Sequence, residues 1–168
     1  MNQSILVIQG APGVGKSTVS VGLGTRIECP VIDFGKLREF HLDSLWERAS
    51  DTEEAMAFGL LLKMMYHYLE HRYIPVIVND IREHRVFDIL SEFSDVTPLV
   101  VTLLVAEYTT LQRRIETRDK GWRDVEAAWQ WNERLKMASL QPGEVRFTVD
   151  GLSEEEVLSE VYKLITSV

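Results

Sequence analysis

Short apolar runs alternate along the chain with longer stretches in which apolar residues recur at helical spacing. The apolar runs lie at 4–9, 30–33, 75–78, 99–105 and 145–149, and the helical stretches at 16–27, 55–70, 83–93, 109–118, 125–137 and from 153 onward. Strands that alternate with helices form a parallel sheet with helices on both faces. The pattern therefore predicts an α/β fold with a five-stranded parallel sheet.

Local signals refine three of these elements. The run at 99–105 is almost entirely apolar, as expected for a strand buried on both faces. The segment 51–54 predicts the start of a helix at Asp51, because an acidic residue follows three positions later. Ser153 with Glu156 predicts a capping box for the last helix.

Length and composition predict a single domain over residues 1–168. The chain is 45% hydrophobic and 26% charged, as is ordinary for globular proteins. Its formal net charge of −8 argues against a general attraction to nucleic acid or to anionic membranes. Cys29 is the only cysteine, which excludes an internal disulfide and fits a reducing compartment. No apolar run is long enough to cross a membrane and the first strand begins almost at once, so we expect a cytoplasmic protein. We expect it to be a monomer or a homodimer.

Residues 10–18 read Gly-Ala-Pro-Gly-Val-Gly-Lys-Ser-Thr, a full match to the phosphate-binding pattern G-x-x-x-x-G-K-S/T. A predicted strand precedes the motif and a predicted helix follows it, as the pattern requires. Lys16 is expected to reach the β- and γ-phosphates, and the Ser17 hydroxyl to ligate Mg²⁺. The expected nucleotide-binding residues are Gly10, Ala11, Pro12, Gly13, Val14, Gly15, Lys16, Ser17 and Thr18. The motif predicts that the chain binds a nucleoside triphosphate.

Two carboxylates follow the next predicted strands along the chain. Asp33 ends the second strand and Asp80 follows the third. In parallel sheets the carboxyl ends of the strands form the ligand-binding edge, so both residues should lie near the triphosphate. Asp80 is a candidate Mg²⁺ ligand, and Asp33 a candidate base or orienting group for an acceptor hydroxyl. Helix capping or a turn is the alternative role for either residue.

Basic residues are concentrated in one region of this acidic chain. Between positions 113 and 136 lie seven of its 18 lysine and arginine residues. Arg114 and Arg118 are four residues apart on one helix face, and Arg123 and Arg134 follow. Guanidinium groups stabilise the charge that develops in phosphoryl transfer, although a solvated surface with acidic neighbours is the alternative.

The chain resembles the nucleoside-monophosphate-kinase-type P-loop kinases, a group that includes adenylate, shikimate and gluconate kinases. Arg114, Arg118, Arg123 and Arg134 are similar in order and spacing to the arginines around the lid of adenylate kinases. The resemblance implies a P-loop NTPase fold with a short arginine-rich lid at about 118–124. It implies that Arg118 and Arg123 close over ATP and the transferring group, that Arg114 contacts the nucleotide, and that Arg134 contacts the acceptor.

The resemblance leaves the acceptor open. Arg38 matches the arginine that binds the acceptor phosphate in adenylate kinases, whereas Asp33 resembles the shikimate and gluconate branch, where an Asp meets an acceptor hydroxyl. Asp80-Ile81-Arg82 is similar to the Asp-x-Arg of phage-type deoxynucleotide kinases and phosphomevalonate kinases, so Arg82 is a further acceptor-binding candidate.

These observations predict an ATP-dependent, Mg²⁺-requiring kinase of a small molecule. A nucleotide-like or otherwise phosphorylated acceptor is favoured, with a hydroxylated metabolite that uses Asp33 as base as the alternative. A nucleotide-dependent regulatory ATPase or switch is an alternative of another class, and a non-catalytic nucleotide-binding module is a third.

Overall fold

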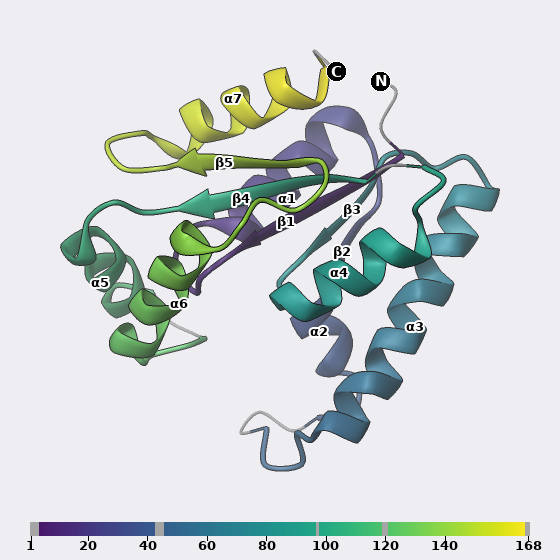
Figure 1. Ribbon diagram of the computed structural model, residues 1–168, viewed down its shortest axis with the longest axis horizontal. Coiled ribbons are helices and arrows are strands. Elements are labelled where there is room, and N and C mark those ends of the chain that lie inside the picture. Colours follow the sequence, from purple (N-terminus) through teal and green to yellow (C-terminus); the bar gives the residue numbers. More distant parts are fainter. Residues whose placement is uncertain (1–3, 43–45, 97, 119–120, 167–168) are drawn as a thin grey trace.

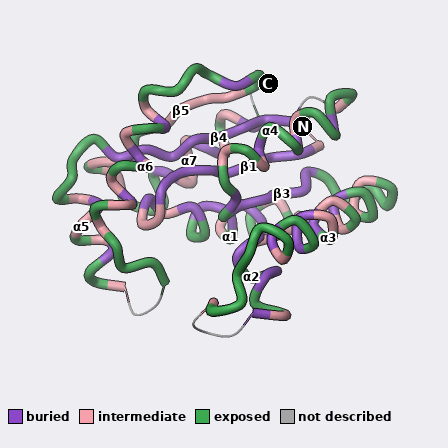
Figure 2. The backbone as a smooth tube through the Cα atoms, turned by 60° about the horizontal axis from the view of Figure 1, so that its bottom comes forward, coloured by how far each residue is buried: buried purple, intermediate pink, exposed green. Residues whose placement is uncertain are grey.

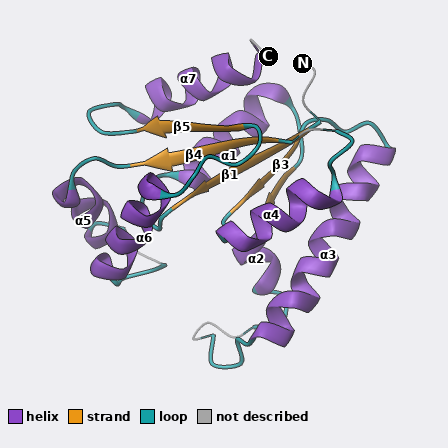
Figure 3. Ribbon diagram, in the orientation of Figure 1, coloured by secondary structure: helices purple, strands orange, loops and turns teal. Residues whose placement is uncertain are grey.

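The computed structural model describes residues 4–42, 46–96, 98–118 and 121–166. Five strands form one parallel sheet in the order β2-β3-β1-β4-β5 (Figures 1 and 3). The strands are β1 (Ile5–Gly10), β2 (Val31–Asp33), β3 (Val76–Asn79), β4 (Leu99–Leu104) and β5 (Glu144–Thr148). All five predicted strands are confirmed, with ends that differ by at most one residue.

The helices connect successive strands and cover both faces of the sheet (Figure 3). They are α1 (Lys16–Ile27), α2 (Phe34–Arg38), α3 (Asp51–Glu70), α4 (Glu83–Glu92), α5 (Tyr108–Glu116), α6 (Val125–Met137) and α7 (Glu154–Thr166). The predicted α/β fold with a five-stranded parallel sheet is therefore confirmed. Within the described residues, no helix is both long and apolar enough to cross a membrane.

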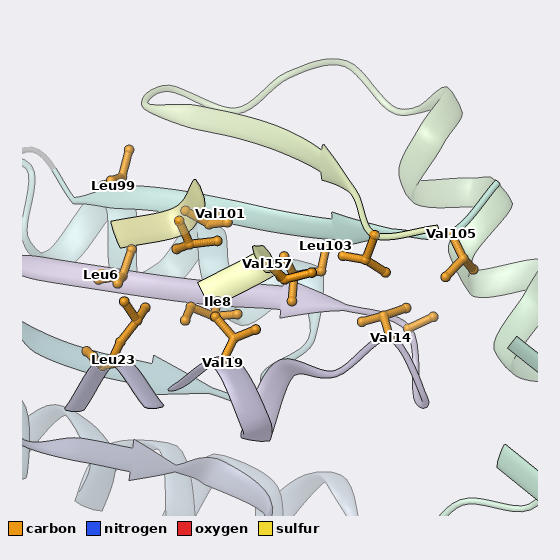
Figure 4. Close-up of a cluster of buried hydrophobic side chains, with 14 of the residues drawn as sticks. Leu6, Ile8, Val14, Val19, Leu23, Leu99, Val101, Leu103, Val105 and Val157 are labelled. Carbon is orange, nitrogen blue, oxygen red and sulfur yellow. The ribbon is translucent and has the colours of Figure 1, made fainter. Parts of the chain in front are cut away.

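The sheet separates two apolar clusters because alternate strand residues point to opposite faces. Leu6 and Ile8 of β1 pack with α1 and α7 on one face (Figure 4), whereas Ile5 and Val7 pack with α3 and α4 on the other. Strands β1 and β4 are buried along their whole length, while α3 presents buried and exposed residues in turn (Figure 2). A core on both faces fixes the register of the strands whose carboxyl ends carry the polar residues.

Side-chain caps mark where α3 and α7 begin. Helix α3 is capped by Ser50, whose hydroxyl accepts a hydrogen bond from the Glu53 N–H at 3.2 Å. The predicted start of the helix at Asp51 is confirmed, but the residue that forms the capping contact is Ser50 and not Asp51. For α7 the capping box is confirmed: Ser153 and Glu156 exchange backbone-to-side-chain hydrogen bonds of 2.8 and 3.3 Å.

Two polar anchors, of which Asn132 is buried, attach the helical region after β4 to the sheet. Asn132 of α6 accepts from the Val105 N–H and donates to the Val105 carbonyl oxygen, both at 2.9 Å. Asp150, after β5, accepts from the backbone N–H groups of Ala106 and Glu107 at 2.6 and 3.2 Å. These contacts hold α5 and α6 beside the carboxyl ends of the strands, where the predicted lid arginines lie (Figure 1).

Candidate active site

The loop between β1 and α1 has the backbone shape of an anion cradle. Gly10, Gly13 and Gly15 have φ angles of 149°, 90° and 104°, which side-chain-bearing residues rarely adopt. A Cβ on Gly15 would meet nothing within 4 Å, so the backbone angle and not crowding favours glycine there. Gly15 directly precedes α1, whose first N–H groups and dipole attract negative charge.

Lys16 lies at the first turn of α1 and is only 7% exposed. Its ammonium donates to the Ala11 carbonyl oxygen at 3.1 Å and lies 3.6 Å from Asp80 Oδ1. Burial lowers the pKa of Lys16, while the neighbouring Asp80 and Asp33 carboxylates raise it. The lysine is thus folded back over the loop, with a carboxylate as its counter-ion.

Asp33 combines a structural contact with a contact to the loop helix. Its Oδ1 accepts from the backbone N–H of Lys36 at 3.0 Å and so caps α2. Its Oδ2 accepts from the Ser17 hydroxyl at 3.4 Å. Burial raises the pKa of Asp33, and the nearby Asp80 carboxylate raises it further against the lowering effect of the Lys36 N–H. Asp33 therefore both caps α2 and contacts the residue that follows Lys16.

Asp80, whose carboxylate lies near the Lys16 ammonium, has an unusual backbone conformation. Its φ is +55°, the left-handed region that non-glycine residues seldom occupy. Gly35 of α2 approaches it so closely that a Cβ on Gly35 would collide with the Asp80 carboxylate. Together, Ser17, Asp33 and Asp80 offer one hydroxyl and two carboxylates, the oxygen ligands that Mg²⁺ prefers. This donor set fits a magnesium ion.

Arg118, one of the arginines of the predicted lid, lies near the loop. Its guanidinium donates to the Trp122 carbonyl oxygen. Burial lowers the pKa of Arg118 and Arg123 lowers it further, while the Asp80 carboxylate raises it. Arg118 is in turn among the groups that lower the pKa of Lys16, so its charge lies near the loop lysine and Asp80. Residues 119 and 120 of the predicted lid lie outside the described residues.

Arg123 and Arg114 make backbone contacts around the loop. Arg123 donates to the Ile115 carbonyl oxygen at 3.4 Å, and Arg114 donates to the Val14 carbonyl oxygen at 3.1 Å. The side chains of Ala11 and Val14 are buried in the core, so the loop offers a ligand their backbone groups and not their side chains. The Arg114 guanidinium therefore braces the loop from the side of α5.

The four acceptor candidates do not share one location. Arg38 and Arg82 line the same cavity of about 180 Å³, between α2, the amino end of α3 and the segment after β3. Arg134 lies on α6, pairs with Glu83 at 3.2 Å and lines a different cavity. Asp33 stands at the loop itself, with its Oδ2 on Ser17. The structure brings Arg38 and Arg82 together and leaves Arg134 apart.

Sequence reasoning missed two acidic residues of the Arg38–Arg82 cavity region. Glu53 binds the Arg38 guanidinium through both oxygens, with Nε contacts of 3.0 and 3.2 Å. Glu54 binds Arg85 in the same forked way, with Nε contacts of 3.0 and 3.1 Å. Both glutamates were visible only as acidic residues in the first turn of a helix, a pattern that predicts capping and not ion pairing.

Comparison of the sequence with known protein families and with curated proteins finds no match. Solved structures are similar over nearly the full length. A sugar kinase from a Janibacter species has a TM-score of 0.72 at 12% identity, with 98% of this chain and 95% of that chain covered. A gluconokinase from Sinorhizobium meliloti has a TM-score of 0.66 at 16% identity, with 99% and 97% covered. For a thymidylate kinase from Candida albicans the TM-score is 0.61 at 14% identity, with 98% and 92% covered.

The similarity extends over the sheet, the loop and the helices on both faces. At these identities it establishes the architecture and not the substrate. The parallel sheet in the order β2-β3-β1-β4-β5, with a glycine-rich loop between β1 and α1, agrees with this result. The chain thus shares the α/β fold of these three kinases.

Proposed function

We propose that this chain is an ATP-dependent small-molecule kinase. The observation that carries the proposal is the convergence of Lys16, Ser17, Asp33 and Asp80 beside a glycine-rich loop and a helix amino terminus. An ammonium, a hydroxyl and two carboxylates in this arrangement are the groups that phosphoryl transfer requires. The fold shared with sugar, gluconate and thymidylate kinases supports the same reaction class.

The loop residues hold the phosphoryl donor in this proposal. The backbone N–H groups of residues 10–18 bind the phosphates, and Lys16 leaves Asp80 to reach the β- and γ-phosphates. Ser17 and Asp80 hold Mg²⁺, which supplies positive charge to the phosphate oxygens when bound. Arg114 keeps the loop in place through Val14.

Asp33 acts on the acceptor. As the acceptor oxygen bonds to the γ-phosphorus and the bond to ADP breaks, the Asp33 carboxylate takes the proton of the acceptor hydroxyl. The raised pKa of Asp33 suits it to receive a proton. Arg118 and Arg123 stabilise the negative charge on the transferring group.

The acceptor enters from the cavity that Arg38 and Arg82 line. Two acceptor classes follow from the sequence: a nucleotide-like or other phosphorylated molecule bound by these arginines together with Arg134, or a hydroxylated metabolite oriented by Asp33.

A coupled ADP-release assay across nucleoside monophosphates, nucleosides and hydroxylated metabolites tests the proposal. We expect ADP release that depends on an acceptor. Strong release without any acceptor would instead favour a regulatory ATPase, and its absence with every acceptor would contradict a kinase.

A further inference from the structure

The charges of the cavity that Arg38 and Arg82 line bear on which acceptor the protein binds. It has a volume of about 180 Å³ and is lined by Arg38, Ala49, Ser50, Asp51, Glu54, Arg82 and His84. Helix α2 and the amino end of α3 lie against each other at this place (Figure 1). Its polar groups are therefore positioned by the core of the domain.

The Arg38 guanidinium is already occupied by a carboxylate. Arg38 is 7% exposed, and its side chain meets Glu53 in a fork, with a further short contact from its terminal nitrogen. The guanidinium carbon lies 4.6 Å from the centre of the Trp46 ring, which covers another side. Glu53 also contacts His41 Nε2 at 2.7 Å. The pairing lowers the pKa of Glu53 to about 2, so the carboxylate stays charged at neutral pH.

A second pair repeats this arrangement at Glu54, which lines the cavity. Arg85 binds both oxygens of Glu54 and reaches Asp88 at 2.8 Å. Its guanidinium carbon lies 4.5 Å from the centre of the Phe58 ring. Glu54 is only 9% exposed, so the pair is largely screened from water.

Because Arg38 and Arg85 are paired with glutamates, their guanidinium groups are not free to bind a phosphate group. A phosphate monoester carries nearly two negative charges and binds through free guanidinium groups. Taking Arg38 from Glu53 would leave a charged carboxylate without its partner in a largely buried place, which is strongly unfavourable. The amino end of α3 offers little help to an anion, because Asp51, Glu53 and Glu54 already occupy its first turn.

Arg82 is the exception among the arginines near the cavity. Its side chain is exposed and has no hydrogen bond or ion pair with any residue in the described part of the chain. One such group can bind a single carboxylate or a hydroxyl. The remaining polar surface consists of carboxylate oxygens, guanidinium N–H groups, the His84 imidazole and the Ser50 hydroxyl, which together match hydroxyl groups that both donate and accept.

We propose, building on the kinase activity proposed above, that the acceptor is a polyhydroxylated molecule without a phosphate group, such as a sugar, a polyol or a sugar acid. The paired glutamates Glu53 and Glu54 exclude phosphorylated acceptors, and Glu54, which lines the cavity, accepts hydrogen bonds from acceptor hydroxyls. Of the two acceptor classes that the sequence left open, the cavity thus favours the hydroxylated one.

A binding experiment tests the exclusion without knowledge of the acceptor. The protein is saturated with a non-hydrolysable Mg·ATP analogue, so that the loop is filled, and titrated with methyl phosphate. We expect Glu53→Gln to bind methyl phosphate at least about tenfold more tightly than the wild type, because Arg38 loses a charged partner while an amide oxygen still holds its geometry. Glu54→Gln makes the same test on Arg85. Glu160→Gln, which removes a carboxylate paired with Lys163 on α7, is the matched control and should behave as the wild type.

Methyl phosphate binding by the wild type as tight as by both variants would overturn the inference. A transfer assay adds the second test: sugars, polyols and sugar acids are compared with nucleoside monophosphates and sugar phosphates at equal concentration. Preferred transfer to the first set supports the inference, and preferred transfer to the phosphorylated set overturns it while leaving the kinase proposal intact. Failure of the ATP analogue itself to bind would instead contradict the kinase proposal.

Discussion

The ammonium of Lys16 lies 3.6 Å from Asp80 Oδ1, so the loop lysine and the carboxylate after β3 form an ion pair. The lysine side chain is 8% exposed and the aspartate side chain is 50% exposed. The buried partner is thus the cation, and the exposed partner is the carboxylate. This pair joins the first residue of α1 to the residue that follows β3, the strand beside β1.

Removing the lid guanidinium should affect the reaction more than nucleotide binding. Arg118 is placed near Lys16 and Asp80, where charge develops during transfer. We expect Arg118→Ala to lower kcat by about 10²–10³ with a small change in nucleotide Kd. Arg113→Ala, on an exposed position of α5, is the matched control and should retain activity. Unchanged transfer in Arg118→Ala would contradict the lid assignment.

Gly35 should tolerate no side chain. An alanine Cβ there collides with the Asp80 carboxylate, so either Asp80 or α2 must move. We expect Gly35→Ala to lower kcat/KM by about tenfold or more, since small displacements of a reacting group are costly. Gly59→Ala, at a helical glycine with nothing within 4 Å, should leave activity unchanged and stabilise α3 by up to about 1 kcal/mol. Steady-state kinetics and thermal melting of the two variants separate these outcomes. Equal activity of both variants would contradict the expectation that a side chain at Gly35 displaces Asp80 or α2.

Asn132 should be a stability determinant. It is fully buried and satisfies both backbone groups of Val105. Asn132→Leu leaves a buried N–H and a buried carbonyl without partners, so we expect the free energy of unfolding to fall by about 2–4 kcal/mol. Gln130→Ala, on the exposed face of the same helix, should change it by less than about 0.5 kcal/mol. Urea denaturation measures both values, and similar losses in the two variants would contradict the anchoring role.

The Arg38–Glu53 pair predicts an acid-dependent loss of stability. The pKa of Glu53 is lowered from its ordinary value of 4.5 to about 2 in the folded protein. Its stabilising contribution is therefore complete above pH 4.5 and disappears as the pH falls toward 2. Glu53→Gln cannot titrate, so its urea midpoint should depend less steeply on pH in this window. If the urea midpoints of the wild type and the variant changed equally with pH, the Arg38–Glu53 pair would add no pH-dependent stability.

The fold was predictable because its signals are local. The apolar runs of the strands and the spacing of loop residues 10–18 need no knowledge of distant contacts. Asp33 and Asp80 were predictable as neighbours because parallel strands end at one edge of the sheet. The cap of α3 was misplaced by one residue because Ser50 and Asp51 are both good capping residues and adjacent.

The ion pairs of the cavity were not predictable from spacing. Arg38 and Glu53 are 15 residues apart, and Arg85 and Glu54 are 31 apart, on elements that meet only through tertiary packing. In the sequence, each of these four residues was visible as a charged residue, but nothing indicated which residue it pairs with. Gly35 likewise became informative only when the position of Asp80 was known.

A calorimetric titration with Mg·ATP is the sharpest test of the proposed kinase, because every role proposed for Lys16 depends on a bound polyphosphate. We expect one-site binding heat and a raised melting temperature for the wild type, with binding weakened by at least about tenfold in Lys16→Ala but not in Lys63→Ala, an exposed lysine on α3. Folded wild-type protein that gives neither heat nor a melting shift would contradict it.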